Sequence, residues 1–257
     1  MVTGATDGIG LGFCEVLVDM GFNVVLISRN KEKLARTEEQ LRSKREVKLK
    51  SIVFDFRDSA DSLKYCCLVE QLKQLDIALL VNNVGTSDAK IFHRFSHSQI
   101  VDILNINCLS MAALSADVLP IMAQRQRKSC LINLSSYMEE KPLPFLALYA
   151  ATKAFNKNLT ESLWHEYPQV DVMCLKPMFV ETPLSRQKKG LTVPDRRECA
   201  RDALKELRWE HETYGHISHR LVGSISKHLI PDWFYRLGVR VLTKRALRKI
   251  FPQAKFD

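Results

Sequence analysis

Residues 1–10 read MVTGATDGIG, with glycines at positions 4, 8 and 10. A short apolar stub precedes the glycines, and a helical pattern of five apolar residues between positions 9 and 20 follows them before Gly21. Glycines between a strand and a helix let the backbone approach a pyrophosphate at the helix N-terminus. We therefore predict a dinucleotide-binding loop, although a tight turn with close helix–strand packing would give the same pattern. The loop residues expected to contact the dinucleotide are Gly4, Thr6, Asp7, Gly8, Ile9 and Gly10.

Short apolar runs then alternate with helical patterns along the chain, which indicates βαβ units. Strands are predicted at residues 23–28, 50–54, 77–81, 130–134 and 170–175, and further helices near residues 32–45, 59–74, 98–124, 147–166 and 195–207. All five strands are short and mostly apolar, as strands covered on both faces are. We predict an α/β fold: a Rossmann-like, doubly wound parallel sheet with helices on both faces.

Length and composition fit one domain followed by a tail, with boundaries at 1–217 and 218–257. The 257 residues are 46% hydrophobic, and their formal net charge is +9. Much of that charge lies late, which favours either anionic partners or a solvated basic face, without spacing typical of nucleic-acid binding. Seven cysteines without a CxxC pair predict reduced thiols, and we expect no metal site. Without an apolar run of eighteen residues, we expect no membrane-spanning helix.

The start of the chain is short for a central strand. Three residues precede Gly4, whereas strands usually have about five or six. We therefore expect that the native chain extends further at its N-terminus.

The end of the second predicted strand indicates whether the cofactor carries a 2′-phosphate. NAD-specific sites present a carboxylate there to the ribose hydroxyls, but this sequence reads Ser28-Arg29-Asn30, with Lys33 nearby. A guanidinium suits bidentate binding of a 2′-phosphate, so we predict NADP(H). A surface arginine is the alternative for Arg29, and a stronger one for Lys33.

Three residues in the second half are candidates for catalysis. Tyr149 and Lys153 are four residues apart in a predicted helix, so their side chains share one face, and Ser136 precedes that helix. A neighbouring ammonium favours a phenolate, so we expect the pKa of Tyr149 to be lowered. Two of these residues have a structural alternative when taken alone: Ser136 could simply end a strand, and Tyr149 could be a core residue.

Five motifs agree in order with one family: TGATDGIG, Asp55 after the third strand, NNVG at residues 82–85, INLSS at 132–136 and YAATK at 149–153. Over nearly its whole length the chain resembles the short-chain dehydrogenases/reductases. The resemblance implies that Tyr149 is the general acid, that Lys153 lowers its pKa and binds the nicotinamide ribose, and that Ser136 polarises the substrate oxygen. It also implies a water-holding role for Asn107, an adenine contact for Asp55, an adenosine-lining role for Asn82 and Gly85, and a carboxamide contact for Thr182.

Finer variants, such as VVLISRN and GSISKHLIPDWF, resemble the branch containing the 17-beta-hydroxysteroid dehydrogenases of types 3 and 12. That branch implies an NADPH-dependent reductase of 17-ketosteroids or very-long-chain 3-oxoacyl-CoA, on the cytosolic face of the endoplasmic reticulum membrane or in the cytoplasm. The alternative is an inactive dinucleotide-binding, membrane-associated protein of the same fold. Met178 stands where most of the family has glycine, which departs from the pattern near the nicotinamide.

Two further segments are candidates for substrate and membrane contact. Residues 181–194 lack periodicity and follow a strand end, so they form either a substrate lid or an ordinary loop. Their basic residues Arg186, Lys188 and Lys189 could face the nucleotide part of an acyl-CoA. The apolar and basic tail, residues 230–256, could lie in a bilayer interface or pack as a C-terminal helix. By resemblance we also expect a homodimer through alanines of the tyrosine helix.

Overall fold

A computed structural model of the chain describes residues 1–207 and 209–229, together with residues 233, 235, 238, 239, 245 and 248. Within this part, seven parallel strands form one sheet in the order β3-β2-β1-β4-β5-β6-β7. The strands are β1 (Val2–Thr3), β2 (Val24–Ser28), β3 (Leu49–Val53), β4 (Leu79–Asn82), β5 (Ser129–Leu134), β6 (Val170–Leu175) and β7 (Glu212–Thr213). The order reverses between β1 and β4, which is where open parallel sheets bind ligands.

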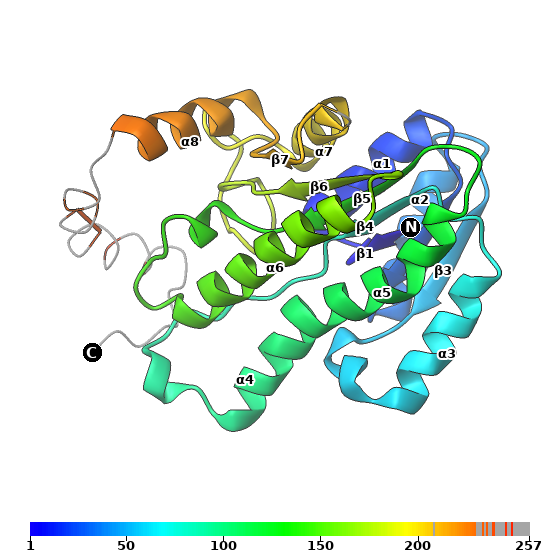
Figure 1. The fold of residues 1–257 in the computed structure, drawn as a ribbon, viewed down its shortest axis with the longest axis horizontal. Coiled ribbons are helices and arrows are strands. Elements are labelled where there is room, and N and C mark those ends of the chain that lie inside the picture. The colour runs from blue at the N-terminus through cyan, green and yellow to red at the C-terminus, as the bar shows by residue number, and fades with distance from the viewer. Residues whose placement is uncertain are drawn as a thin grey trace.

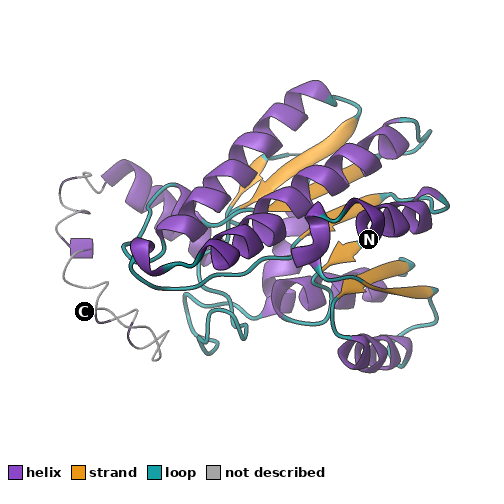
Figure 2. Cartoon of the chain, turned by 90° about the horizontal axis from the view of Figure 1, so that it is seen from below, coloured by secondary structure: helices purple, strands orange, loops and turns teal. Residues whose placement is uncertain are grey.

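Helices cover both faces of this sheet (Figures 1 and 2). They are α1 (Gly8–Asp19), α2 (Lys31–Arg42), α3 (Ser62–Lys73), α4 (His97–Leu104), α5 (Ser110–Ala123), α6 (Ala147–Glu166), α7 (Arg196–Glu206) and α8 (Ile217–Leu229). One apolar core lies under α1, α2 and α7, and the other lies under α3, α5 and α6. The predicted doubly wound α/β fold is therefore confirmed.

The predicted strands begin within two residues of the observed ones. The predicted helix 98–124 is divided: α4 and α5 are joined by a π-helical turn, Asn105–Leu109, and Pro120 lies inside α5. The predicted helix 59–74 begins with a separate 3₁₀ turn, Phe56–Ala60, because Asp61 caps α3. The sequence reading missed β7, whose two residues are too few to show an alternating pattern.

One helical stretch, His97–Ala123, is long and apolar enough to cross a membrane by length and composition alone. It was not singled out from the sequence, because an uninterrupted apolar run was the criterion there. Its α5 part buries five large apolar side chains against the sheet, so it serves as a core helix of this fold. Those side chains are Met111, Leu114, Val118, Leu119 and Met122.

The helix α8 lies at the end of the molecule where α6 begins (Figure 1). His219, Gly223 and Ser226 are buried, and the predicted boundary between residues 217 and 218 falls at its first turn. Most of the tail predicted to contact a bilayer, residues 230–256, lies outside the described residues.

Candidate active site

The glycine loop is shaped by contacts that leave no room for side chains. Gly4 and Gly8 have φ values of 64° and 52°, which glycine adopts without a steric penalty. A Cβ on Gly10 would overlap the Gly4 carbonyl oxygen and the side-chain amide of Asn83. That amide donates to the carbonyl of Thr3 over 2.8 Å, while the Thr3 hydroxyl accepts from the Asn83 and Val84 N–H groups. The end of β4 therefore fixes the loop against the start of α1.

Neighbouring residues of the loop are tied to β2 and to the helix. The hydroxyls of Thr6 and Ser28 lie 2.9 Å apart, joining the loop to the end of β2. Asp7 caps α1 by accepting from the N–H of Gly8, and its other oxygen contacts Lys33 over 3.3 Å. Ile9 is partly buried against the core under α1. Backbone N–H groups at this helix start are thus held at the carboxyl end of the sheet, where an anion is stabilised.

Arg29 and Asp55 follow the carboxyl ends of β2 and β3. Arg29 is exposed, and no ion pair joins it to another residue of the described part. Asp55 accepts from Arg57, whose guanidinium holds the pKa of that carboxyl below its usual range. The predicted adenine contact of Asp55 is untested, but its carboxylate already has a partner.

Ser136, Tyr149 and Lys153 meet at the carboxyl end of β5. The Ser136 side chain hydrogen-bonds to the Tyr149 hydroxyl, and the Lys153 ammonium lies 5.6 Å from the centroid of the tyrosine ring. The ammonium is buried and donates to the Leu134 carbonyl over 2.9 Å. The structure therefore brings together the three residues that the motif spacing singled out, and it places Ser136, rather than Ser135, against the phenol.

The electrostatic balance at Tyr149 differs from the sequence expectation. Burial raises the pKa of Tyr149 above its ordinary value, and the hydrogen bond from Ser136 opposes that rise only in part. Burial also lowers the pKa of Lys153 to about 8. The expected lowering of the tyrosine pKa is therefore wrong for this structure, because desolvation of the phenolate outweighs the stabilising groups. At neutral pH the phenol keeps its proton.

Asn107 lies in the π-helical turn, facing the same region. Its amide oxygen accepts from the Thr86 N–H over 2.8 Å, and its amide nitrogen donates to the Thr86 carbonyl and the Thr152 hydroxyl. Gly85 lies beside it, since a Cβ there would be 3.7 Å from the Asn107 amide oxygen and 3.6 Å from the Lys153 nitrogen. Asn107 thus connects the end of β4 to the helix of Lys153, whereas Asn105 donates to the Arg57 carbonyl.

The side chain of Asn82 is buried, donating to Ser115 over 3.1 Å and to the Asn133 oxygen over 2.9 Å. Its expected adenosine-lining role stays a prediction. The next residue, Asn83, makes the loop contacts instead. Successive side chains of a strand point to opposite faces, and only the register of β4 decides between two adjacent asparagines. The structure therefore adds Asn83 to the residues that shape the glycine loop.

The segment 181–194 closes on itself beside the glycine loop. The Glu181 N–H donates to the Pro194 carbonyl over 2.9 Å, which ties its two ends together. The Thr182 methyl is the nearest group to the place where a Gly8 Cβ would lie, at 3.2 Å. A cleft of about 490 Å³ contains both Asp7 and Thr182. Lys189 forms ion pairs with Asp195 and Glu198, and its expected contact with an acyl-CoA stays a prediction.

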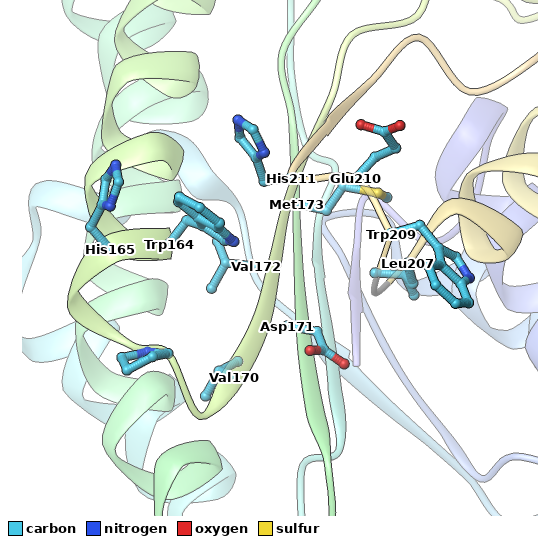
Figure 3. Close-up of a pocket in the computed structure, with 11 residues that line it drawn as sticks. Trp164, His165, Val170, Asp171, Val172, Met173, Leu207, Trp209, Glu210 and His211 are labelled. Atoms are coloured by element: carbon cyan, nitrogen blue, oxygen red, sulfur yellow. The ribbon is translucent and has the colours of Figure 1, made fainter.

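A second cavity, of about 340 Å³, lies along β6 away from these residues (Figure 3). Trp164 stacks on His211 with ring centroids 4.6 Å apart on one side of the strand, whereas Trp209 lies on the other side. The two tryptophans therefore do not form a single aromatic box, and none of the predicted site residues lines this cavity.

The sheet order, the glycine loop at its switch point and the Ser-Tyr-Lys group define a nicotinamide-dinucleotide oxidoreductase. The family described as short chain dehydrogenase matches residues 1–190, and the chain belongs to that family. Over 241 residues it is 35% identical to 17-beta-hydroxysteroid dehydrogenase type 3 of Danio rerio, covering 91% of this chain and 77% of that protein. Over 244 residues it is 36% identical to the very-long-chain 3-oxoacyl-CoA reductase of Homo sapiens, covering 91% and 76%.

Another relative carries a different description. The chain is 33% identical over 258 residues to the inactive hydroxysteroid dehydrogenase-like protein 1 of Homo sapiens, covering 97% of this chain and 77% of that protein. Among solved structures, a 7beta-hydroxysteroid dehydrogenase has a TM-score of 0.82 at 23% identity, covering 92% and 94% of the two chains. A short-chain dehydrogenase from Sphingobium yanoikuyae in complex with NADPH has a TM-score of 0.75 at 23% identity, covering 100% and 97%. These structural likenesses support the fold.

The residues present fit a dinucleotide. The loop stands at the N-terminus of α1, which suits a pyrophosphate, and it is packed so closely that a Cβ at Gly10 would overlap the Gly4 carbonyl. Lys153 lies near Gly85, where a Cβ would be 3.6 Å from its ammonium nitrogen. These features fit a nicotinamide dinucleotide.

Proposed function

We propose that the chain is an NADPH-dependent carbonyl reductase of apolar ketones, with a 17-ketosteroid or a long-chain 3-oxoacyl-CoA as substrate. The observation that carries the proposal is the hydrogen bond between Ser136 and Tyr149, made beside the buried ammonium of Lys153. NADPH, when bound, supplies the hydride. Two relatives, named for 17-beta-hydroxysteroid dehydrogenase and very-long-chain 3-oxoacyl-CoA reductase activity, support the substrate class.

In this proposal Tyr149 protonates the carbonyl oxygen while Ser136 donates a second hydrogen bond to it. Negative charge develops on that oxygen during reduction, and preorganised donors there are typically the largest catalytic contribution. The raised pKa of Tyr149 favours this direction, because a general acid must carry its proton at the working pH. Lys153 and Arg29 would hold the ribose and the 2′-phosphate, and Asn107 would keep the turn beside Lys153 in place.

The surroundings of Tyr149 support an apolar substrate. The tyrosine packs at the edge of a small hydrophobic cluster formed around Ala89 and Leu146. The other members of the cluster are Met138, Leu143 and Phe145, all partly exposed. An apolar wall beside the acid would bind a hydrocarbon skeleton and orient its ketone, since burial of apolar surface gives about 25 cal/mol per Å².

We also propose that the molecule works at a membrane surface, the cytosolic face of the endoplasmic reticulum in keeping with the resemblance. One face of α8 presents Ile217, Leu221, Val222 and Ile225, which are all exposed. Leu191 of the neighbouring segment 181–194 is 96% exposed. Clustered apolar side chains on a basic protein favour an acidic bilayer, which is also where lipid ketones reside.

A second candidate is a dinucleotide-binding protein without turnover, favoured by the relative named inactive. A panel of ketosteroids and 3-oxoacyl-CoAs, with loss of NADPH absorbance as the readout, separates the two. Oxidation with at least one class supports the reductase and identifies the substrate. Tight NADPH binding without oxidation for any ketone would favour the second candidate.

A further inference from the structure

A buried charge cluster lies around Lys176, next to the residues that follow Ser136 in the sequence, and the proposed catalysis does not use it. Lys176 follows β6, and its side chain is only 1% exposed. Its ammonium contacts the carboxylates of Glu139, Glu140 and Glu212, of which the Glu139 contact is 3.3 Å, and it lies 4.7 Å from the centre of the Tyr214 ring. Tyr214 donates its hydroxyl to Glu140 over 2.8 Å. One cation thus faces three carboxylates.

Such a cluster binds a proton readily, because a single ammonium does not offset three negative charges in a buried place. Glu139 is the most buried of the three carboxylates, with a side chain 3% exposed. Burial raises its pKa to about 7, while Lys176 opposes that rise. The titratable groups that face it are Lys176 and Cys174 from β6 and its end, Glu212 and Tyr214 from β7 and its end, Lys157 from α6, and the adjacent Glu140.

Glu139 reaches the catalytic helix through Ser135. The Ser135 hydroxyl lies 3.1 Å from a Glu139 oxygen and 2.7 Å from the Lys153 carbonyl oxygen. A hydroxyl has one proton to donate, so it cannot donate to both acceptors at once. Both contacts are satisfied together only when Glu139 carries a proton and donates it to the Ser135 oxygen. Ser135 then donates to the carbonyl of Lys153.

We propose that Glu139 is a positioning residue. In its protonated form it completes a series of hydrogen bonds from Glu139 through Ser135 to the Lys153 carbonyl. These bonds hold α6, which carries Tyr149 and Lys153, against the residues that follow β5. The proposal rests on the proposed reductase function. Ser136 directly follows Ser135, and Lys153 lies one helical turn after Tyr149. These hydrogen bonds therefore set the distance between the Ser136 and Tyr149 hydroxyls. When Glu139 ionises, its carboxylate competes for the Ser135 proton and the contact to α6 weakens.

The test compares the wild type with Glu139→Gln, whose side-chain amide donates to Ser135 at any pH. The matched control is Glu140→Gln, which removes the same charge from the Lys176 cluster without touching Ser135. As the pH rises through neutrality, we expect the kcat of the wild type and of Glu140→Gln to fall with the loss of one proton. Above that pH range Glu139→Gln should retain about twofold to tenfold more kcat than the wild type, in line with the net value of one hydrogen bond. The KM for NADPH should not change.

A second readout needs no turnover. Hydrogen exchange of residues 147–157 in the cofactor-free wild type should accelerate between about pH 5.5 and about pH 8.5 relative to Glu139→Gln measured at the same pH. Ser135→Ala, which keeps the acid but breaks the chain, should exchange faster than wild type at the lower pH and lack the relative change. If the difference in exchange rate between the wild type and Glu139→Gln is the same at both pH values, the positioning role is overturned. Absence of turnover in the wild type would instead refute the reductase function, leaving the exchange result to decide this proposal.

Discussion

Replacing Lys176 by methionine removes the one cation from the buried cluster of three carboxylates while keeping most of the side-chain volume. Breaking a buried ion pair by removing one partner costs about 3–5 kcal/mol of the free energy of unfolding. Glu140 and Glu212 have side chains 18% and 26% exposed and can regain some hydration, so we expect the low end, about 3 kcal/mol, at about pH 8.

The loss should depend on pH in a defined direction. The pKa of Glu139, already raised to about 7, should rise further without Lys176, well above the ordinary value of 4.5 that an unfolded chain has. Between those two values the native state binds more protons than the unfolded state, so stability falls as pH rises. At about pH 5 Glu139 is protonated in the folded variant, and the loss should shrink to about 1 kcal/mol.

Urea unfolding at the two pH values, followed by circular dichroism, measures both quantities. The control is Lys205→Met, which removes a surface ion pair with Asp202 on α7, away from the cluster, and should cost less than about 1 kcal/mol. A loss for Lys176→Met that is the same at both pH values, or no larger than that of the control, would refute the charge reasoning.

Three further changes test the cleft and the surface. Gly10→Ala should weaken NADPH binding, measured by fluorescence titration, by about tenfold or more, because its Cβ would overlap the Gly4 carbonyl. The control, Gly190→Ala, should bind NADPH normally, because nothing lies within 4 Å of its Cβ. Arg29→Glu should weaken NADPH by about tenfold or more and leave NADH nearly unaffected; equal losses for both would argue against a 2′-phosphate contact. Leu221→Glu should reduce co-sedimentation with acidic vesicles, and unchanged sedimentation would remove α8 from the membrane contact.

The sequence predicted the parts of the site that depend on spacing along the chain. The glycine loop lies within ten residues, and Tyr149 and Lys153 share a helix face because they are four residues apart. Their chemistry needs little knowledge of distant packing, and the structure brings them together with Ser136.

What depends on packing was not predictable. Adjacent asparagines at 82 and 83 point to opposite faces, so their roles follow from the register of β4 and not from the motif. The raised pKa of Tyr149 depends on desolvation by residues remote in sequence. Glu139 and Glu212 meet at Lys176 only because β7 pairs with the end of β6, and those two β7 residues leave no pattern in the sequence.

The most direct test of the proposed chemistry is the turnover of Tyr149→Phe with the ketone that the wild type reduces best. NADPH binding should stay close to that of the wild type, because the ring remains and only the hydroxyl is lost. The rate of ketone-dependent NADPH oxidation should fall by about a hundredfold to ten-thousandfold, the usual contribution of a general acid. Turnover within about tenfold of the wild type would show that another group delivers the proton.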